Sequence, residues 1–252
     1  MHLTQRQQKI IALLQEKGQI TVDELSELLF FSPSTIRREL EILQQYELIR
    51  RTHGGAVIKT RWDEGVPALI RENQETASKM QIAQAAASYI NDGDHLFIDS
   101  SSTALLMADF LKDHSQLTVF TNGFQLASQL LHCPKIKTIC TGGQLVSASH
   151  SFVGAHAQRF FEYYFADKLF FSSNSFSISH GVTDNSETET ELKRQMVRHA
   201  RQVFYLADAS KIEHTSTYKI CAASDIHMLI TNASPDIFRK ENTLPFQIHR
   251  II

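Results

Sequence analysis

The stretch FSPSTIRREL, residues 31–40, combines a helix start with two adjacent arginines. Ser32 is a favourable N-cap residue, and Pro33 suits the first position of a helix. We therefore expect a helix to begin here and to run to about Tyr46. The feature that needs explaining is the pair of guanidinium groups near the start of this helix.

The apolar residues of the predicted helix share one face, because they are spaced four and three apart. They are Ile36, Leu40 and Leu43. Arg37 and Arg38 fall away from this face, so we expect them to lie in solvent. Two roles suit exposed arginines at this place: a surface ion pair with Glu41, or contact with DNA.

The segments on either side predict a winged helix-turn-helix. Residues 3–18 have the helical spacing of apolar residues, and a short β-like stretch at 20–22 leads into a second helix. After the helix that begins at Ser32, residues 48–49 and 56–58 read as two short strands around a Gly-Gly turn. The order helix, short strand, helix, helix, hairpin is that of a winged DNA-binding domain.

Local charge favours the DNA role for the arginines. The whole chain has a formal net charge of −2, which is no signature for nucleic acid or for a membrane surface. Residues 35–61, however, carry six Lys or Arg and three Glu, a net charge of +3, while residues 1–34 net −1. The positive charge is thus confined to the third helix and the hairpin, the two elements that a winged helix presents to DNA.

Residues 21–57, TVDELSELLFFSPSTIRRELEILQQYELIRRTHGGAV, resemble the DNA-binding domain of the DeoR family of bacterial transcriptional regulators. That family carries an "SxxTIRRDL" helix and an "RxHGGA" wing, and the resemblance extends to the C-terminus. One departure is Glu39, where the family usually has Asp. Together with the charge pattern, the resemblance implies these DNA contacts in the helix and wing: Ser34, Thr35, Arg37, Arg38, Arg50, Arg51, His53 and Gly54.

The rest of the chain alternates between short apolar runs and helical segments. Buried runs of this kind, separated by helices, indicate parallel strands in an open, Rossmann-like α/β sheet. We expect a DNA-binding domain over 1–58, a linker over 59–74 and an α/β domain over 75–252. One of the predicted helices runs from about Ser102 to Lys112.

The resemblance implies that the α/β domain is a sugar-phosphate sensor whose fold is similar to that of sugar-phosphate isomerases. Open α/β sheets bind ligands at the carboxyl ends of their strands. The loops after the first three strands and two lysines at family motif positions are therefore the expected effector contacts. They are Asp99, Ser101, Ser102, Thr103, Thr121, Asn122, Gly142, Gly143, Lys193 and Lys211.

Two departures from the family pattern fall in this expected site. Ser101 stands where the family usually has Gly, and residues 172–175, Ser-Ser-Asn-Ser, stand where it tends to read G-x-D-G. A Cβ then replaces a hydrogen where the backbone approaches the ligand. The pocket is expected to be narrower or more polar, or its ligand atypical.

The sequence therefore predicts a transcriptional regulator, a repressor of a carbohydrate-metabolism operon. It would bind a double-stranded DNA operator as a homo-oligomer, dimer or tetramer, and leave it when a phosphorylated sugar binds. One alternative is a DNA-binding protein whose second domain senses nothing and serves for assembly. Another is a sugar-phosphate isomerase with an added N-terminal domain; Asn174 could not be its base, which leaves Asp99 and Glu189.

Other classes of protein are disfavoured by the composition. The three cysteines lack the spacing of a disulfide framework or a zinc site, and the twelve histidines form no HxH or HxxxH pair. We expect no metal, no cofactor and no enzymatic activity. The N-terminus lacks the apolar core of a signal peptide, and no apolar run is long enough to cross a bilayer, so we expect a cytoplasmic protein.

Overall fold

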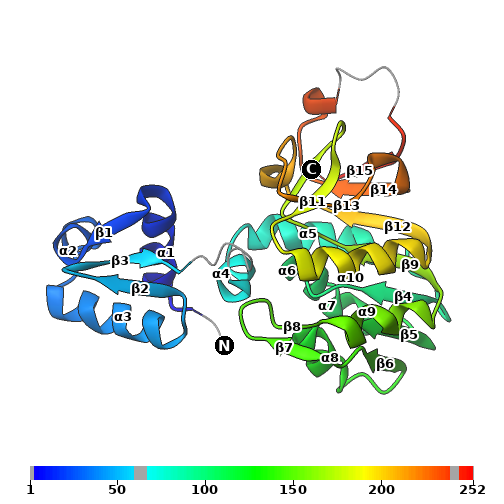
Figure 1. Ribbon diagram of the computed structural model, residues 1–252, viewed down its shortest axis with the longest axis horizontal. Coiled ribbons are helices and arrows are strands. Elements are labelled where there is room, and N and C mark those ends of the chain that lie inside the picture. The colour runs from blue at the N-terminus through cyan, green and yellow to red at the C-terminus, as the bar shows by residue number, and fades with distance from the viewer. Residues whose placement is uncertain (1–2, 60–66, 239–243, 252) are drawn as a thin grey trace. The chain divides into compact units, whose positions relative to one another are not determined.

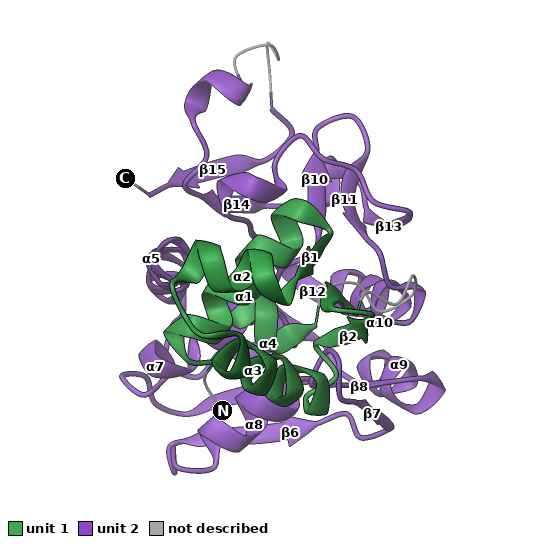
Figure 2. Ribbon diagram, turned by 90° about the vertical axis from the view of Figure 1, so that its left-hand side faces the viewer, with its two compact units in different colours: residues 1–74 green, residues 75–252 purple. Residues whose placement is uncertain are grey.

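The computed structural model describes residues 3–59, 67–238 and 244–251. The chain divides into two compact units, residues 1–74 and 75–252, shown in different colours in Figure 2.

The first unit is a winged helix-turn-helix, as the sequence predicted. Its three strands form an antiparallel sheet of order β1-β3-β2 (Figure 1). In the chain, β1 lies between α1 and α2, and β2 and β3 follow α3. The predicted apolar face of α3 is fully buried in the core of this unit, which holds the helix in place. The elements are α1 Gln5–Lys17, β1 Gln19–Thr21, α2 Val22–Leu29, α3 Pro33–Gln45, β2 Ile49–Thr52, β3 Gly55–Ile58 and α4 Ala68–Glu72.

The start of α3 is fixed by the cap that the sequence predicted. The Ser32 side chain accepts a hydrogen bond from the backbone N–H of Thr35 at 3.3 Å, and Pro33 occupies the first turn. The Ser32 side chain satisfies a backbone N–H that the helix start leaves without a partner, and Pro33 has no N–H to satisfy. The first exposed turn of α3 therefore has a defined backbone.

The two glycines of the wing have different physical reasons. Gly54, at the tip of the β2–β3 hairpin, has a φ of +92°, which L side chains rarely adopt. Gly55 packs against β1, and a Cβ there would lie 2.1 Å from the backbone oxygen of Ile20. The first glycine thus makes the turn, and the second allows the hairpin to pair closely with β1.

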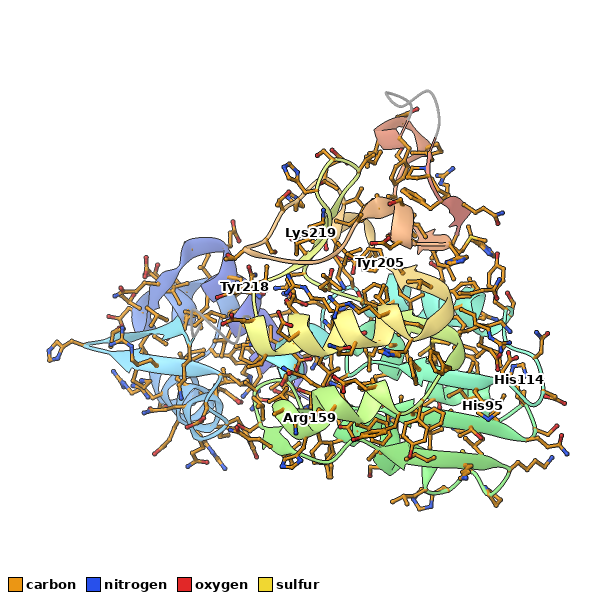
Figure 3. All side chains as sticks on the ribbon, turned by 45° about the vertical axis from the view of Figure 1, so that its right-hand side comes forward. His95, His114, Arg159, Tyr205, Tyr218 and Lys219 are labelled. Atoms are coloured by element: carbon orange, nitrogen blue, oxygen red, sulfur yellow. The ribbon has the colours of Figure 1, made fainter. Side chains whose placement is uncertain are left out.

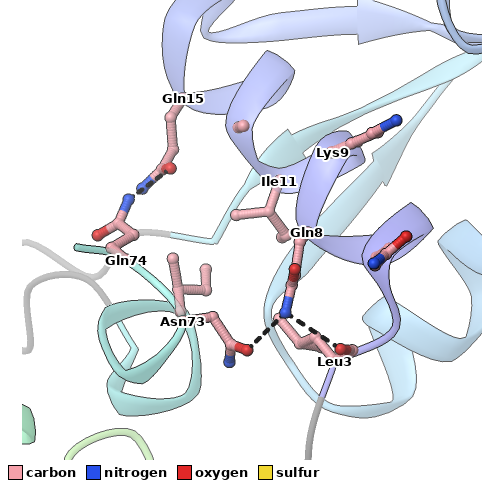
Figure 4. A pocket seen from close by; sticks show the side chains of 10 residues that line it. Leu3, Gln8, Lys9, Ile11, Gln15, Asn73 and Gln74 are labelled. Carbon is pink, nitrogen blue, oxygen red and sulfur yellow. Dashed lines mark hydrogen bonds between the residues drawn. The ribbon is translucent and has the colours of Figure 1, made fainter. Parts of the chain in front are cut away.

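Helix α4, within the predicted linker, packs on α1 in the first unit. Ile70 is buried and lines the same groove as Leu3 and Ile11, which are labelled in the close-up in Figure 4. Gln8 Nε2 donates to Asn73 Oδ1 at 2.8 Å, and Gln74 Nε2 donates to Gln15 Oε1 at 2.7 Å. A groove of about 550 Å³ remains between the two helices.

The second unit is built on a seven-stranded parallel sheet of order β15-β14-β12-β9-β4-β5-β6. Every neighbouring pair of these strands is parallel, which confirms the open α/β sheet predicted from the sequence. The strands are β4 His95–Ile98, β5 Leu117–Thr121, β6 Ile136–Cys140, β9 Ala166–Phe171, β12 Ala200–Leu206, β14 Met228–Thr231 and β15 Gln247–Arg250.

Helices cover both faces of this sheet, because alternate residues of each strand point to opposite sides. Phe97 and Phe171 pack with α9 and α10, whereas Leu96 and Phe170 pack with α5 to α8. The helices are α5 Thr76–Ala87, α6 Ser102–Leu105, α7 Ala108–Leu111, α8 Phe124–Leu130, α9 Ala155–Glu162 and α10 Glu187–Arg198.

The structure differs from the sequence expectation in two places. The single helix expected over 102–112 is instead two short helices, α6 and α7, with a break at residues 106–107. Two small antiparallel sheets, β7-β8 and β10-β11-β13, were not predicted. Their strands are β7 Gln144–Val146, β8 Ser151–Val153, β10 Ser175–Ser177, β11 Gly181–Asp184 and β13 Tyr218–Cys221; three short 3₁₀ turns are η1 Ala209–Lys211, η2 Ala223–Asp225 and η3 Pro235–Phe238.

Candidate DNA-binding surface and effector site

The exposed face of α3 presents both arginines to solvent. Arg37 and Arg38 are exposed, and neither forms an ion pair with any residue that the structure describes. The surface ion pair with Glu41, the alternative to a DNA contact for these arginines, is therefore not formed. Ser34 is also exposed, and Thr35 is half-buried beside the Ser32 cap. This face offers two guanidinium groups and two hydroxyl groups within one turn.

A polar network that sequence analysis missed ties α3 to the start of α1. The carboxylate of Glu39 accepts from Arg6 Nη1 at 2.7 Å and from Gln7 Nε2 at 3.0 Å. Gln7 also accepts from the backbone N–H of Thr4, closing the capping box of α1. The Arg6 guanidinium lies 4.2 Å from the centroid of the Phe31 ring, just before α3. Glu39 therefore sets the position of α3 relative to α1.

The predicted DNA contacts of the wing differ in their exposure to solvent. Arg50, His53 and Gly54 are exposed, as contact with DNA requires. Arg51 is half-buried, and its Nε is buried without a hydrogen-bond partner among the described residues. Neighbouring residues of a strand point to opposite faces, which explains the difference between the two arginines.

In the second unit, two of the predicted effector residues, Ser101 and Lys193, contact the buried carboxylate of Asp99, just after β4. One of its oxygens accepts from the backbone N–H of Ser101 at 3.2 Å and from its hydroxyl at 2.6 Å. The other accepts from the backbone N–H of Ser172, after β9, at 3.4 Å. Burial raises the pKa of Asp99, while nearby Lys193 and these hydrogen bonds oppose that rise. Asp99 thus joins the ends of β4 and β9.

Lys193, on α10, is buried between carboxylates. Its Nζ lies 2.8 Å from Asp184 Oδ2 and 3.6 Å from Asp99 Oδ2. Burial alone would lower the pKa of Lys193, but Asp184, Asp99 and Glu189 together raise it above its usual value. The lysine is therefore charged, and its charge is already balanced by protein groups.

Glu189, one turn before Lys193, was named from the sequence only as a possible isomerase base and not as an effector contact. Its Oε1 accepts a short hydrogen bond from the Ser151 hydroxyl of β8, 38 residues away in the chain. Its Oε2 is buried and has no partner among the described residues. Burial raises the pKa of Glu189, and Lys193 and Ser151 oppose the rise.

On the other face of the sheet, a lysine that was not predicted from the sequence contacts one of the predicted hydroxyl groups. Lys79 of α5 is buried, and its Nζ donates to Ser102 Oγ at 3.2 Å. The neighbouring Thr103 Oγ1 is buried and unpartnered within the described part of the chain. After β5, Asn122 Nδ2 donates to Ser100 Oγ at 3.3 Å, and Thr121 Oγ1 accepts from the backbone N–H of Gly123 at 2.9 Å.

Lys211 and the serines that replace the family glycines are hydrogen-bonded to one another or to their surroundings. Lys211 Nζ donates to Ser172 Oγ at 2.7 Å and lies 3.8 Å from Asp208. The hydroxyl of Ser175, at the second family glycine, lies 2.8 Å from that of Ser216. Ser173, at the variable position of the family pattern, has its hydroxyl 2.8 Å from that of Tyr205, which is buried inside the unit and labelled in Figure 3. The hydroxyls that the substitutions add thus have partners within the protein.

Gly142 and Gly143, after β6, shape their loop. Their φ values are +64° and +104°. A Cβ on Gly143 would lie 2.7 Å from the backbone oxygen of Val153 in β8. The glycines therefore allow the β6 loop to approach β8, the strand that supplies Ser151.

The residues that the structure describes contain neither a metal-ligand cluster nor a membrane-spanning helix. No group of three or more His, Cys, Asp or Glu side chains is arranged to hold a metal ion. Among the same residues, no helix has both the length and the apolar composition needed to cross a bilayer.

Two protein-family models match the chain. Residues 6–61 match the DeoR-like helix-turn-helix domain, and residues 74–233 match the DeoR C-terminal sensor domain. Ribose 5-phosphate isomerase A of Methanocaldococcus jannaschii, a solved structure, is 15% identical, with a TM-score of 0.39 and 53% of each chain covered. A score this low supports no argument about activity.

Curated relatives cover nearly the whole chain. HTH-type transcriptional regulator GolR of Listeria innocua is 37% identical and covers 90% of both chains. The uncharacterized HTH-type transcriptional regulator YulB of Bacillus subtilis is 36% identical, covering 94% of this chain and 91% of its own. The glycerol-3-phosphate regulon repressor of Escherichia coli is 29% identical and covers 94% of both chains. With a helix-turn-helix unit, an α/β sensor unit and relatives of this extent, the chain belongs to the DeoR family of transcriptional regulators.

Proposed function

We propose that this regulator represses a carbohydrate-metabolism operon and leaves its operator when a phosphorylated sugar binds the second unit. The observation that carries the sensing role is the group of buried polar side chains at the carboxyl edge of the parallel sheet. Such an edge is where open α/β sheets bind ligands. Buried polar atoms without partners are uncommon in native proteins, and a bound ligand would satisfy them.

Double-stranded DNA is the partner of the first unit in this proposal. The exposed side chains of α3 would enter the major groove, with Arg37 or Arg38 reading guanine or holding a phosphate. Arg50 and His53 of the wing would contact the flanking backbone, with Arg51 giving less because it is half-buried. Helix-turn-helix regulators commonly read paired half-sites as dimers, so we propose a homo-oligomer, dimer or tetramer, acting in the cytoplasm.

The phosphate of the effector would lie beside Lys79, Ser102 and Thr103. Lys79 supplies positive charge, and the two hydroxyls supply donors that a phosphate accepts. Lys211 would add charge from the β12 side after releasing Ser172. The glycerol-3-phosphate regulon of the Escherichia coli relative supports a phosphorylated effector.

A second candidate function is DNA binding without sensing. It is favoured by the serines at 172 and 173, whose hydroxyls are already hydrogen-bonded to Lys211 and Tyr205. In that case the second unit would serve for assembly alone. An isomerase is a weaker candidate, because Asn174 supplies no base and both oxygens of Asp99 accept hydrogen bonds, which leaves only Glu189 with an oxygen that has no partner among the described residues.

The two candidates are separated by a screen of sugars and sugar phosphates. Operator release and thermal stabilisation are measured with hexose and pentose phosphates, and with the matching free sugars as controls. Sensing predicts that some phosphates release the DNA and that their free sugars do not. Stabilisation or release by none of the compounds would favour the non-sensing candidate, and turnover of any phosphate would reveal an isomerase.

A further inference from the structure

A connected series of contacts links polar side chains at the carboxyl edge of the sheet. Asn122 contacts Ser100, which is next to Asp99 in the chain. Asp99 pairs with Lys193, and one helical turn away Glu189 accepts from Ser151. Ser151 forms a β-bridge with Gly123, the residue after Asn122. Residues that follow β4 and β5, the first residue of β8 and two residues of α10 therefore form one connected polar group.

Two oxygen atoms of this series lack a hydrogen-bond partner that a ligand could supply. Glu189 Oε2 and Asn122 Oδ1 are buried and have no hydrogen-bond partner within the described residues. Glu189 is 8% exposed and Asn122 is 0% exposed, so bulk water does not replace the missing partners. Asn122 Oδ1 is an acceptor, and Glu189 Oε2 is an acceptor when the carboxylate is ionised. The group that suits them is a hydrogen-bond donor.

The surrounding hydrogen bonds leave Glu189 no other partner. The Ser151 hydroxyl has a single proton and gives it to Glu189 Oε1, so the Ser149 hydroxyl, 2.6 Å away, must donate to Ser151. Lys193 is held by Asp184 at 2.8 Å. The open oxygen of Glu189 is therefore a fixed acceptor held by its neighbours.

Acceptors and donors lie on opposite sides of the sheet. Glu189 and Lys193 come from α10, which covers one face, whereas Lys79 and Thr103 come from α5 and α6, which cover the other. Three carboxylates, of Asp99, Asp184 and Glu189, surround the single ammonium group on the α10 side, so an anionic phosphate is disfavoured there. The site has one end for an anion and another for donors.

We infer that Glu189, with Asn122, binds hydroxyl groups of the effector at the end opposite to its phosphate. This inference rests on the proposed sensing function and narrows the effector class. The effector is a phosphate ester whose carbon chain carries hydroxyl groups several carbons away from the phosphate. Alkyl phosphates of the same length and inorganic phosphate lack the groups that Glu189 selects.

The experiment compares Glu189→Gln with wild-type protein in calorimetric titrations of the full chain. Glutamine keeps the oxygen that accepts from Ser151 but replaces the open acceptor by an amide NH₂ group. The ligands are the tightest hexose phosphate from the screen, n-hexyl phosphate and inorganic phosphate. Glu187→Gln, at an exposed position in the first turn of the same helix, is the matched control for the loss of one charge.

The expected result is a loss of at least tenfold in affinity for the hexose phosphate in Glu189→Gln and no loss in Glu187→Gln. Affinities for hexyl phosphate and inorganic phosphate should stay the same in all three proteins. Equal affinity of wild-type protein for the hexose and hexyl phosphates would overturn the inference, and this arm needs no variant. Unchanged hexose-phosphate affinity in a folded Glu189→Gln protein would also overturn it, while leaving the sensing function intact. If wild-type protein binds no hexose or pentose phosphate, the sensing function fails as well.

Discussion

Arg37 and Arg38 are the side chains whose loss should affect operator binding most directly. Each is exposed on α3 beside a fully buried apolar face, so truncation removes the proposed DNA contact and no core packing. Arg37→Ala or Arg38→Ala should weaken operator binding by about 1–3 kcal/mol, while the melting temperature stays the same. Gel-shift titrations on a selected operator measure this, with exposed Arg201→Ala as control. Wild-type affinity in both α3 variants would disprove the assignment.

Glu39→Asp tests whether carboxylate reach positions α3. Aspartate keeps the charge but is one methylene shorter, so it should not hold both Arg6 and Gln7. Losing a hydrogen bond to a charged group of this kind costs about 1.5–3 kcal/mol. The variant should therefore melt at a lower temperature and bind the operator more weakly, although Glu39 itself makes no DNA contact in our proposal. A melting temperature equal to that of wild type would show that the network is dispensable.

Glu189 should lower the stability of the folded chain at neutral pH. Burial raises its pKa above the value near 4.5 of an unperturbed glutamate. A raised carboxylate pKa means that its stability contribution is greatest below the unfolded pKa and is lost as pH rises through the folded pKa. Glu189→Gln should therefore raise the melting temperature at pH 8, and the gain should shrink towards pH 4. A gain that does not vary with pH would contradict this explanation.

At the scale of elements, the wing should supply a salt-dependent part of operator affinity. Arg50 is exposed on β2, and a phosphate contact would release about one counterion. Arg50→Ala should reduce the slope of log affinity against log salt by about 0.9. Arg51→Ala should change the slope less, because Arg51 is half-buried. An unchanged slope for Arg50→Ala would show that the wing does not meet the DNA backbone.

The elements that could be predicted from sequence are those with strong local signals. Ser32 and Pro33 marked the start of α3, and apolar runs marked the parallel strands. Strands β10 and β11 were missed because they are three and four residues long and the first is rich in serine. The break between α6 and α7 could not be predicted because the segment contains no Gly or Pro.

The site was partly predictable for a similar reason. Residues directly after strands, such as Asp99 and Asn122, are brought together by any parallel sheet, so strand ends predict them. Lys79 lies inside a helix with no distinguishing neighbours, and its partner Ser102 is 23 residues away. The pairing of Glu189 with Ser151 depends on how α10 packs near β8, which no local pattern encodes.

At the scale of the whole molecule, effector binding and operator release should be separable by mutation. Lys211 lies in the second unit and contacts Ser172. Lys211→Met should therefore lower the affinity for the effector and leave the proposed DNA-binding residues unchanged. An effector shifts the equilibrium only through its different affinities for the two states. Operator affinity without effector should therefore stay the same, while release should need more effector. Fluorescence anisotropy of labelled operator during effector titration measures both; a variant released at the wild-type concentration would remove Lys211 from the site.

Helix α4 determines where this protein can be divided. Its Ile70 is buried against α1, and covering such a side chain stabilises a fold by about 1.5–3 kcal/mol. In a DNA-binding fragment cut after residue 58, the apolar surface of α1 that Ile70 covers would be exposed to solvent. Gln8 and Gln15 would also lose their hydrogen bonds with Asn73 and Gln74. In chimeric regulators that combine the DNA-binding unit of one protein with the sensor unit of another, the junction should therefore lie after residue 74. The DNA-binding unit then keeps α4, which covers part of its surface.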